Sequence, residues 1–270
     1  MRWKRATILD DLLWDVFSHY WKVHRPAYAT LFLNSTAHFQ HMYWRNMDAA
    51  SFAIKPSQEE QAEYERAVEA GYTSMDALVG ECIKLAGPDT VIVLVSGLSQ
   101  QPCLTYEDQS GKTFYRATDP DAFFAWAGVR APYRYVPMMS EEFHLHFPDE
   151  STAAECLRMF EALTAHGKRI MNARQAGNEI HASCSVFTSM DGNTVVLNAN
   201  GGQIPFGQLF YQADGLKSGM HHPDGIFWVR DSARKPSLSA RRVSLRAVAP
   251  TIVAHFGIPK PDYMALDSVL

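Results

Sequence analysis

Two histidine-bearing segments, far apart in the chain, place the strongest constraint on how it can fold. The first, residues 34–45, contains His38 and His41. The second, residues 219–227, contains a pair of histidines that begins at His221. A fold that brings the segments together would gather three or four imidazoles around one pocket, and clustered imidazoles are typical of a zinc site. The chemistry of this protein therefore depends on whether the two segments converge.

The composition indicates a globular chain with a sizeable core. Of its 270 residues, 47% are hydrophobic and 12% are aromatic, which is enough for one large domain or a domain with an insert. The formal net charge is −4, so no basic excess points to nucleic acid. No apolar run reaches the about 18 residues that indicate a membrane helix. The four cysteines lack CxxC spacing, which favours buried thiols in a reducing compartment. We therefore expect a cytoplasmic protein without nucleic-acid or membrane partners.

The apolar pattern predicts helices near both ends of the chain, with a parallel strand between them. Helical spacing of apolar residues predicts helices over residues 7–24, 57–70, 74–86 and 244–256. Residues 27–33 form a short apolar run that predicts a buried strand. Residues 91–95 are a continuous apolar run, four of them β-branched, which is typical of a parallel strand that is covered on both faces. Ligands bind at the carboxyl ends of such strands, and this strand ends at Ser96.

Residues 102–184 have a different pattern, which predicts a small α+β insert. The pattern predicts strands over residues 133–136 and 143–147, and a helix over residues 151–166. In the second strand His144 and His146 lie on one face, because side chains alternate along a strand. Such a pair can bind a metal ion, but we favour a solvated polar face as its interpretation.

Three segments follow one another in an order that resembles a known family. Residues 41–45, His-Met-Tyr-Trp-Arg, are similar to the end of an Asp-x-x-x-His metal motif. Residues 91–97 are similar to the strand that leads into a Ser-Asp-His-Gly motif. Residues 219–226, with residues 243–252 and 257–259, are similar to a closing Gly-x-His segment and a last helix. In these features the chain resembles the alkaline phosphatase superfamily, in particular its type I phosphodiesterase/nucleotide pyrophosphatase branch.

The resemblance implies both a fold and an activity. The implied fold is an α/β sandwich around a mostly parallel sheet, with the core in residues 1–101 and 185–270 and a cap-like α+β insert in residues 102–184. The implied activity is the hydrolysis of small phosphate or sulfate esters at a metal site. A metal-dependent phosphoesterase or phosphodiesterase is therefore the first functional hypothesis.

The resemblance also implies a metal site, which this chain can form only with altered ligands. His41 and His221 occupy two of the family's ligand positions. The aspartate position holds Ala37, and we expect His38 to replace the missing carboxylate. His38, His41 and His221 would then bind one divalent ion, zinc or manganese. The alternative is that these histidines are hydrogen-bonded groups in a cleft that no longer holds metal.

The substrate site and the catalytic groups are less complete. We expect Asn34, Ser96 and His222 to contact the substrate. The two positions after Ser96 hold Gly97 and Leu98, where the family has Asp and His, and the strand that carries the family's nucleophile is not found. No catalytic residue is therefore assigned. The second hypothesis is an inactive relative, or the C-terminal part of a larger enzyme. Such a protein would bind a ligand or partner through the cleft in which the family has its active site. Without the missing strand the predicted sheet would have an unpaired edge. We expect a second copy or an N-terminal companion chain to cover that edge.

Overall fold

In the computed structural model the chain forms two units, which are described separately. The structure describes residues 2–109, 112–139, 141–213 and 217–270. Unit 1 consists of Met1–Phe39, Arg66–Gln101 and Met220–Leu270, and unit 2 consists of Gln40–Glu65 and Pro102–Gly219. The longer segment of unit 2 begins at Pro102, where the sequence predicts that an insert begins, and it runs to Gly219 rather than to residue 184.

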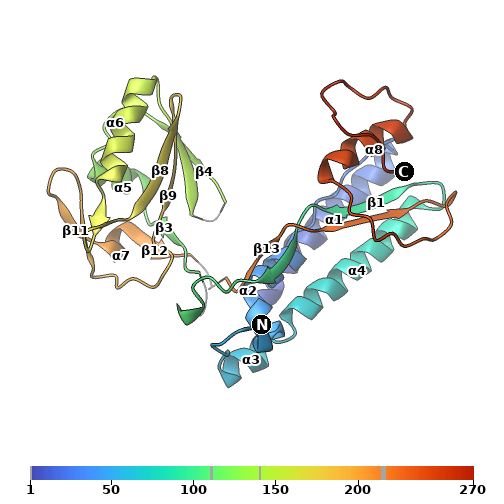
Figure 1. The fold of residues 1–270 in the computed structure, drawn as a ribbon, viewed down its shortest axis with the longest axis horizontal. Helices are drawn as coiled ribbons and strands as arrows, with labels where there is room; N and C mark the ends of the chain where they lie inside the picture. The colour runs from blue at the N-terminus through green and yellow to red at the C-terminus, as the bar shows by residue number, and fades with distance from the viewer. Residues whose placement is uncertain (1, 110–111, 140, 214–216) are drawn as a thin grey trace. The chain divides into compact units, whose positions relative to one another are not determined.

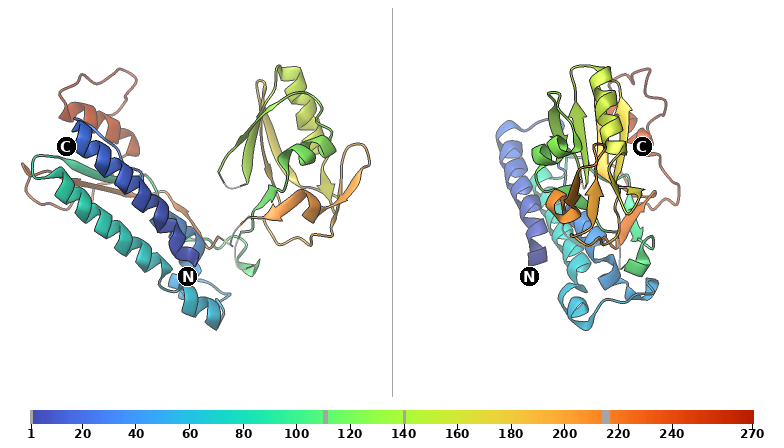
Figure 2. Two further views of the ribbon diagram at one scale, coloured as in Figure 1. Left: turned by 180° about the vertical axis from the view of Figure 1, so that it is seen from behind. Right: turned by 90° about the vertical axis from the view of Figure 1, so that its left-hand side faces the viewer.

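Unit 1 is built on two long helices that lie side by side (Figure 1, Figure 2). Its helices are α1 (Ala6–His24), α4 (Ala67–Ala86) and α8 (Val248–His255), and its strands are β1 (Ile92–Ser96) and β14 (Ile226–Arg230). Three elements have residues in both units: α2 (Ser35–Met47) and the paired strands β2 (Ser99–Pro102) and β13 (Gly219–His222). Short 3-10 helices are η1 (Arg2–Arg5), η2 (Ala49–Ser51), η3 (Glu107–Gln109) and η4 (Leu245–Ala247).

The start of α2 is fixed by an aspartate from α1. Asp10 is buried, and its two carboxylate oxygens accept hydrogen bonds from the backbone N–H groups of Asn34 and Ser35, each at 3.0 Å. The first N–H groups of a helix have no partner within the helix, so a carboxylate satisfies them and interacts favourably with the helix dipole. Residues 27–33 form no strand, contrary to the sequence-based prediction, and Phe32 is exposed.

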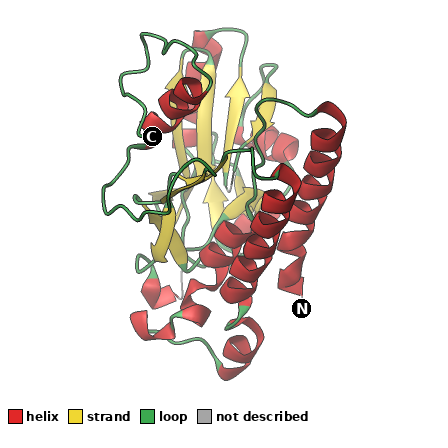
Figure 3. Cartoon of the chain, turned by 90° about the vertical axis from the view of Figure 1, so that its right-hand side faces the viewer, coloured by secondary structure: helices red, strands yellow, loops and turns green. Residues whose placement is uncertain are grey.

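The prediction of a mostly parallel sheet is wrong. β1 pairs with β14 in an antiparallel two-stranded ribbon, with Ile92 opposite Arg230 and Ser96 opposite Ile226. The paired strands of the described sheets are antiparallel, and the sheets have two or four strands. Figure 3 shows these strands in yellow and the helices in red. The ribbon leaves apolar side chains partly in solvent, so the apolar run of residues 91–95 does not mark a strand covered on both faces. A short apolar run does not by itself distinguish these two situations.

Unit 2 has an α+β architecture. Its helices are α3 (Gln58–Tyr64), α5 (Pro120–Ala127), α6 (Glu150–Glu161) and α7 (Phe206–Leu209). Its strands are β3 (Tyr115–Ala117), β4 (Arg134–Pro137), β5 (Glu142–His146), β6 (Thr164–Ala165), β7 (Lys168–Arg169), β8 (Met171–Ala176), β9 (Glu179–Cys184), β10 (Val195–Leu197), β11 (Gln203–Pro205) and β12 (Phe210–Gln212). The four-stranded sheets have the orders β4-β5-β9-β8 and β11-β10-β6-β7, and β12 pairs with β3.

The core of unit 2 lies between α5, α6 and one face of the β4-β5-β9-β8 sheet. Phe124 of α5 and Phe160 of α6 are fully buried, and the ring of Phe143 on β5 packs against both at 5.2 and 6.0 Å between centroids. Aromatic pairs at these distances stabilise a core beyond the burial of their area. The predictions of strands over residues 133–136 and 143–147 are confirmed by β4 and β5. The helix predicted over residues 151–166 is α6, which is shorter and capped by Asp149.

Candidate metal centre

The alternation of β5 separates its aromatic core residues from two histidines. Phe143 and Leu145 are buried beneath the sheet, whereas His144 and His146 are half-buried on the opposite face. Successive side chains of a strand point to opposite faces, so residues two apart lie on the same face. The sequence-based prediction that the two histidines share a face is therefore confirmed, and the polar face has a definite set of neighbours.

The neighbouring strand β9 places a carboxylate beside this histidine pair. In the antiparallel register His146 lies opposite Glu179, and His144 lies opposite His181. The ligand atoms of His144, His146 and Glu179 all lie within 4.8 Å of one another. Within the described ranges these three residues are the one group of three or more His, Cys, Asp or Glu side chains close enough to hold a metal ion together. The cluster comes from two hydrogen-bonded strands, which fix its backbone positions.

Electrostatics favour the ligating form of His144. Burial lowers the pKa of His144 below its ordinary value, and the adjacent His181 lowers it further. The two rings stack, with 3.8 Å between their centroids. A metal ion binds the neutral imidazole, so a lowered pKa removes part of the competition from protons at neutral pH.

Glu179 lies between two imidazoles. Its Oε1 lies 2.9 Å from Nδ1 of His146, and its Oε2 lies 3.4 Å from Nε2 of His181. Arg174 on β8 donates a hydrogen bond to Nδ1 of His181 at 2.6 Å. Because a guanidinium is always a donor, Nδ1 of His181 is an acceptor, and the proton of the neutral ring is on Nε2, facing Glu179. Nε2 of His181 lies near the carboxylate but makes no hydrogen bond to it, so His146 is the imidazole in closest contact with Glu179.

The predicted ligands from the two histidine-bearing segments lie on α2 and β13. His38 and His41 are on α2, and His221 is on β13. His38 and His221 are exposed and belong to unit 1, whereas His41 is half-buried and belongs to unit 2. The metal site of His38, His41 and His221 stays a prediction.

The two segments do meet at one point within unit 2. Nδ1 of His41 lies 2.9 Å from the backbone carbonyl oxygen of Gly219, to which it donates. The N–H of Ser218 donates to the carbonyl of His41 at 2.8 Å, and the Ser218 hydroxyl accepts from the N–H of Arg45 at 3.1 Å. Gly219 is required here, because a Cβ on it would overlap the carbonyl oxygen of Gln40. The bond to Gly219 fixes the ring of His41 and leaves the lone pair of the neutral form on Nε2.

The three predicted substrate contacts have local hydrogen bonds in unit 1. The Ser96 hydroxyl donates to the carbonyl of Leu98 at 2.6 Å. Nδ1 of His222 accepts from the N–H of Asp224 at 3.1 Å. The N–H of Asn34 donates to the carboxylate of Asp10. Ser96 ends a strand of the antiparallel ribbon, so its predicted position at the carboxyl edge of a parallel sheet is lost with that sheet. A substrate role for Asn34, Ser96 and His222 stays a prediction.

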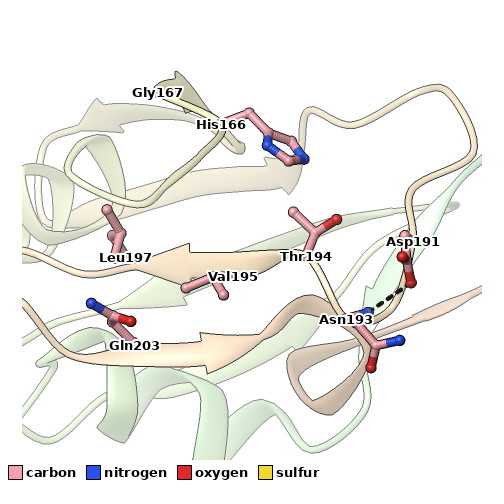
Figure 4. A pocket seen from close by; sticks show the side chains of 8 residues that line it. All are labelled: His166, Gly167, Asp191, Asn193, Thr194, Val195, Leu197 and Gln203. Carbon is pink, nitrogen blue, oxygen red and sulfur yellow. Dashed lines mark hydrogen bonds between the residues drawn. The ribbon is translucent and has the colours of Figure 1, made fainter.

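A separate depression on unit 2 offers less chemistry than the histidine cluster. It has a volume of about 620 Å³ and lies along the other four-stranded sheet. Figure 4 shows His166 apart from the remaining polar side chains, and the Asn193 N–H bonded to the carboxylate of Asp191, at 2.9 Å. The depression is lined by His166, Gly167, Asp191, Asn193, Thr194, Val195, Leu197 and Gln203. One imidazole and one carboxylate that is bonded to its own turn do not form a metal site with enough ligands.

The sequence-based reasoning missed Glu179 and His181. Both lie on β9, which follows β8 after the two residues Gly177 and Asn178. A two-residue loop that starts with glycine between alternating segments is a hairpin signal, so β9 itself was detectable. Its pairing with β5, distant in the chain, has no local signal.

A scan against models of protein families, a search of curated proteins and a search of solved structures each find no match to this chain.

Proposed function

We propose that unit 2 binds one divalent transition-metal ion, zinc first of all, through His144, His146 and Glu179. The observation that carries this proposal is the convergence of their ligand atoms within 4.8 Å. Two imidazoles and one carboxylate form the protein ligand set of many catalytic zinc sites and of non-haem iron sites. Three protein ligands leave at least one coordination position for water or a substrate oxygen.

The ion would draw the three side chains closer together. Zinc bonds to nitrogen and oxygen are about 2.0–2.2 Å long, so tetrahedral ligand atoms lie roughly 3.4 Å apart. Their ligand atoms lie within 4.8 Å of one another without the ion. Small rotations of the half-buried side chains can shorten these distances, while β5 and β9 keep their backbones in register. Glu179 would exchange its contact with His146 for a bond to the ion.

The charges around the cluster favour an anionic ligand. Arg174 lies beside His181 on β8, and Arg134 lies opposite His146 on β4, so exposed guanidinium groups flank the cluster on both sides. Guanidinium groups bind phosphate and sulfate oxygens well. A bound ion polarises such an oxygen and lowers the pKa of coordinated water. We therefore extend the proposal to metal-dependent hydrolysis of small phosphate or sulfate esters, the activity implied by the sequence resemblance, on an antiparallel scaffold. An inactive, ligand-binding protein is the alternative.

Calorimetric titration of the full chain with zinc chloride, and separately with manganese chloride, tests the metal proposal. We expect one zinc equivalent, and an affinity at least about 100-fold lower for His146→Ala and Glu179→Gln, because two ligands do not make a site. His166→Asn is the matched control, since it removes an exposed imidazole of the same unit. Wild-type affinity in the cluster variants would overturn the proposal. Turnover of a generic phosphate ester that requires zinc and Glu179 would support the catalytic part, and a metal-loaded but inactive protein would favour the alternative.

A second metal site at His41 is favoured by one observation, its bond to the Gly219 carbonyl. Metal-binding histidines usually donate their other ring nitrogen to a carbonyl or carboxylate, which fixes the ring. The sequence resemblance implies His38 and His221 as its other ligands. Loss of zinc binding in His41→Ala, with binding retained in His146→Ala, would assign the ion to this set.

The four cysteines are free thiols, which supports a reducing compartment. We therefore propose that the protein is located in the cytoplasm.

A further inference from the structure

A small cavity, here called the α2–α3 cavity, lies within unit 2. Tyr43 and Arg45 of α2 line it together with Glu60 and Tyr64 of α3, and Ser218 contributes to it from the position just before β13. Its volume is about 200 Å³. Pockets for drug-sized ligands are roughly 300–1,000 Å³, so this cavity suits a smaller molecule. It shares no residue with the proposed metal centre on β5 and β9.

The wall of the cavity is formed by a kink in α2. Tyr43 has non-helical backbone angles, φ −121° and ψ 19°. In a regular helix the N–H of Arg45 bonds to the carbonyl of His41. Here the N–H of Ser218 donates to that carbonyl at 2.8 Å, and the Ser218 hydroxyl accepts from the N–H of Arg45 at 3.1 Å. A group that inserts into the hydrogen-bond ladder kinks a helix, so Ser218 fixes the shape of this wall.

The cavity presents one cation and one anion side by side. Arg45 is buried, and its Nη2 donates to Oε1 of Glu60 at 3.0 Å. A guanidinium carries five N–H donors, so it can bind a second carboxylate beside Glu60. The Glu60 side chain is 40% exposed, and a carboxylate accepts more than one donor. The other lining residues that the structure describes carry no formal charge, so the two charges of the cavity cancel.

Two tyrosine rings give the cavity an apolar surface. Tyr43 and Tyr64 stack with their centroids 4.8 Å apart and their planes 21° apart. Burial raises the pKa of Tyr43, and Tyr64 and Glu63 raise it further, so its ring is neutral at neutral pH. Met42 adds a thioether to the lining. Aromatic faces pack against hydrocarbon and also attract an ammonium group.

We infer that the α2–α3 cavity binds a free α-amino acid with a small apolar side chain, as its zwitterion. The carboxylate of the ligand pairs with Arg45, its ammonium group pairs with Glu60, and its side chain lies against the tyrosine rings. A ligand with a carboxylate alone would place an uncompensated anion beside Glu60, and an amine alone would place a cation beside Arg45. The end of a peptide carries only one of the two charges. This inference goes beyond the proposed metal-binding function and does not depend on it.

Nuclear magnetic resonance titration of the isotope-labelled full chain tests the inference with three matched probes. L-leucine carries both charges, 3-methylbutylamine is the same molecule without the carboxylate, and 4-methylpentanoate is the same molecule without the amine. We expect saturable shifts of the backbone amides of residues 42–46 and 60–64 with L-leucine. We expect its affinity to be at least about tenfold higher than that of either analogue, because each analogue loses one charge-assisted contact. An analogue that binds as tightly as L-leucine would overturn the inference, as would the absence of saturable shifts at these residues.

Removal of the anion gives a second, independent readout. Glu60→Gln keeps the size of the side chain, and glutamine also serves in the capping box that Glu60 forms with Ser57. We expect this variant to bind L-leucine about tenfold more weakly and 4-methylpentanoate more tightly than the wild type, because the charge of Arg45 is then unbalanced. Glu59→Gln is the matched control, since it removes the same charge from the neighbouring exposed position outside the cavity and leaves both affinities unchanged.

Unchanged affinity for L-leucine in Glu60→Gln would overturn the inference, because an apolar depression without charge recognition would behave in that way. Far-ultraviolet circular dichroism shows whether each variant is folded. If Glu60→Gln is unfolded, the comparison of the three probes on the wild-type chain decides the question by itself.

Discussion

Substitution of glycine by alanine should have opposite effects on stability at two positions of α4. Gly71 and Gly80 both lie inside this helix, where alanine is intrinsically better than glycine by about 0.5–1 kcal/mol. A Cβ on Gly80 meets nothing within 4 Å. A Cβ on Gly71 would lie 2.5 Å from Cδ2 of Phe39. Gly80→Ala should therefore stabilise the protein, whereas Gly71→Ala should destabilise it.

The size of the difference follows from the packing around Phe39. Carbon atoms pack best at about 3.5–4.0 Å, so the ring must retreat by about 1 Å. Phe39 is fully buried and its ring packs edge-on against Trp3 at 5.6 Å. The Thr36 hydroxyl also donates to the carbonyl of Gly71 at 3.1 Å, which holds α2 close to α4. Such overpacking costs about 1–3 kcal/mol. Since the helix-propensity gain is common to both variants, their free energies of unfolding should differ by about 1–3 kcal/mol.

Urea denaturation followed by circular dichroism measures this difference. Gly80→Ala should unfold at a higher urea concentration than the wild type, and Gly71→Ala at a lower one than Gly80→Ala. Phe39→Leu removes the ring atom that the new methyl group would meet, so G71A should cost less in an F39L background. Equal stabilisation by G71A and G80A would refute the close packing of Phe39 on α4.

Three further outcomes are expected. Gly219→Ala should separate the two histidine-bearing segments, because its Cβ overlaps the Gln40 carbonyl; increased hydrogen exchange around residue 41 would report this, and unchanged protection would contradict it. Burial first, and then the hydrogen bond to a carboxylate, raise the pKa of Tyr133 to about 12. The stabilisation that this raised pKa gives the fold is fully present below the ordinary value near 10 and is lost as the pH rises towards 12. The free energy of unfolding of the wild type should therefore fall relative to that of Tyr133→Phe over that range. Burial also raises the pKa of Cys184 to about 12, so a thiol reagent at neutral pH should label the half-buried Cys82 well before Cys184; peptide mapping of the labelled protein showing the reverse order would contradict this burial.

Local patterns in the sequence predicted local structure well. The alternation of residues 143–147 predicted β5 and the shared face of His144 and His146, because the two-residue period of a strand is a property of the backbone. The predicted helices over residues 57–70 and 74–86 left a break that includes Gly71, but Gly71 lies inside α4. The close approach of Phe39 explains why this helical position has no Cβ.

Long-range pairing could not be predicted in the same way. The apolar run of residues 91–95 suits a parallel strand and an antiparallel ribbon equally well, and only its partner β14 decides between them. The site depends on pairing too, because Glu179 is brought to His146 by the register of β5 and β9. The segments at His41 and Gly219 meet through a histidine and a carbonyl group, whereas the predicted convergence of His38, His41 and His221 on one ion stays a prediction.

Anomalous diffraction at the zinc absorption edge, from crystals of the full chain grown with zinc, tests the proposed metal centre most directly. A single strong peak should lie between β5 and β9, about 2.0–2.2 Å from a ring nitrogen of His144, a ring nitrogen of His146 and a carboxylate oxygen of Glu179. A peak beside His41, with none on the sheet, would contradict this account and place the metal chemistry in the two histidine-bearing segments instead.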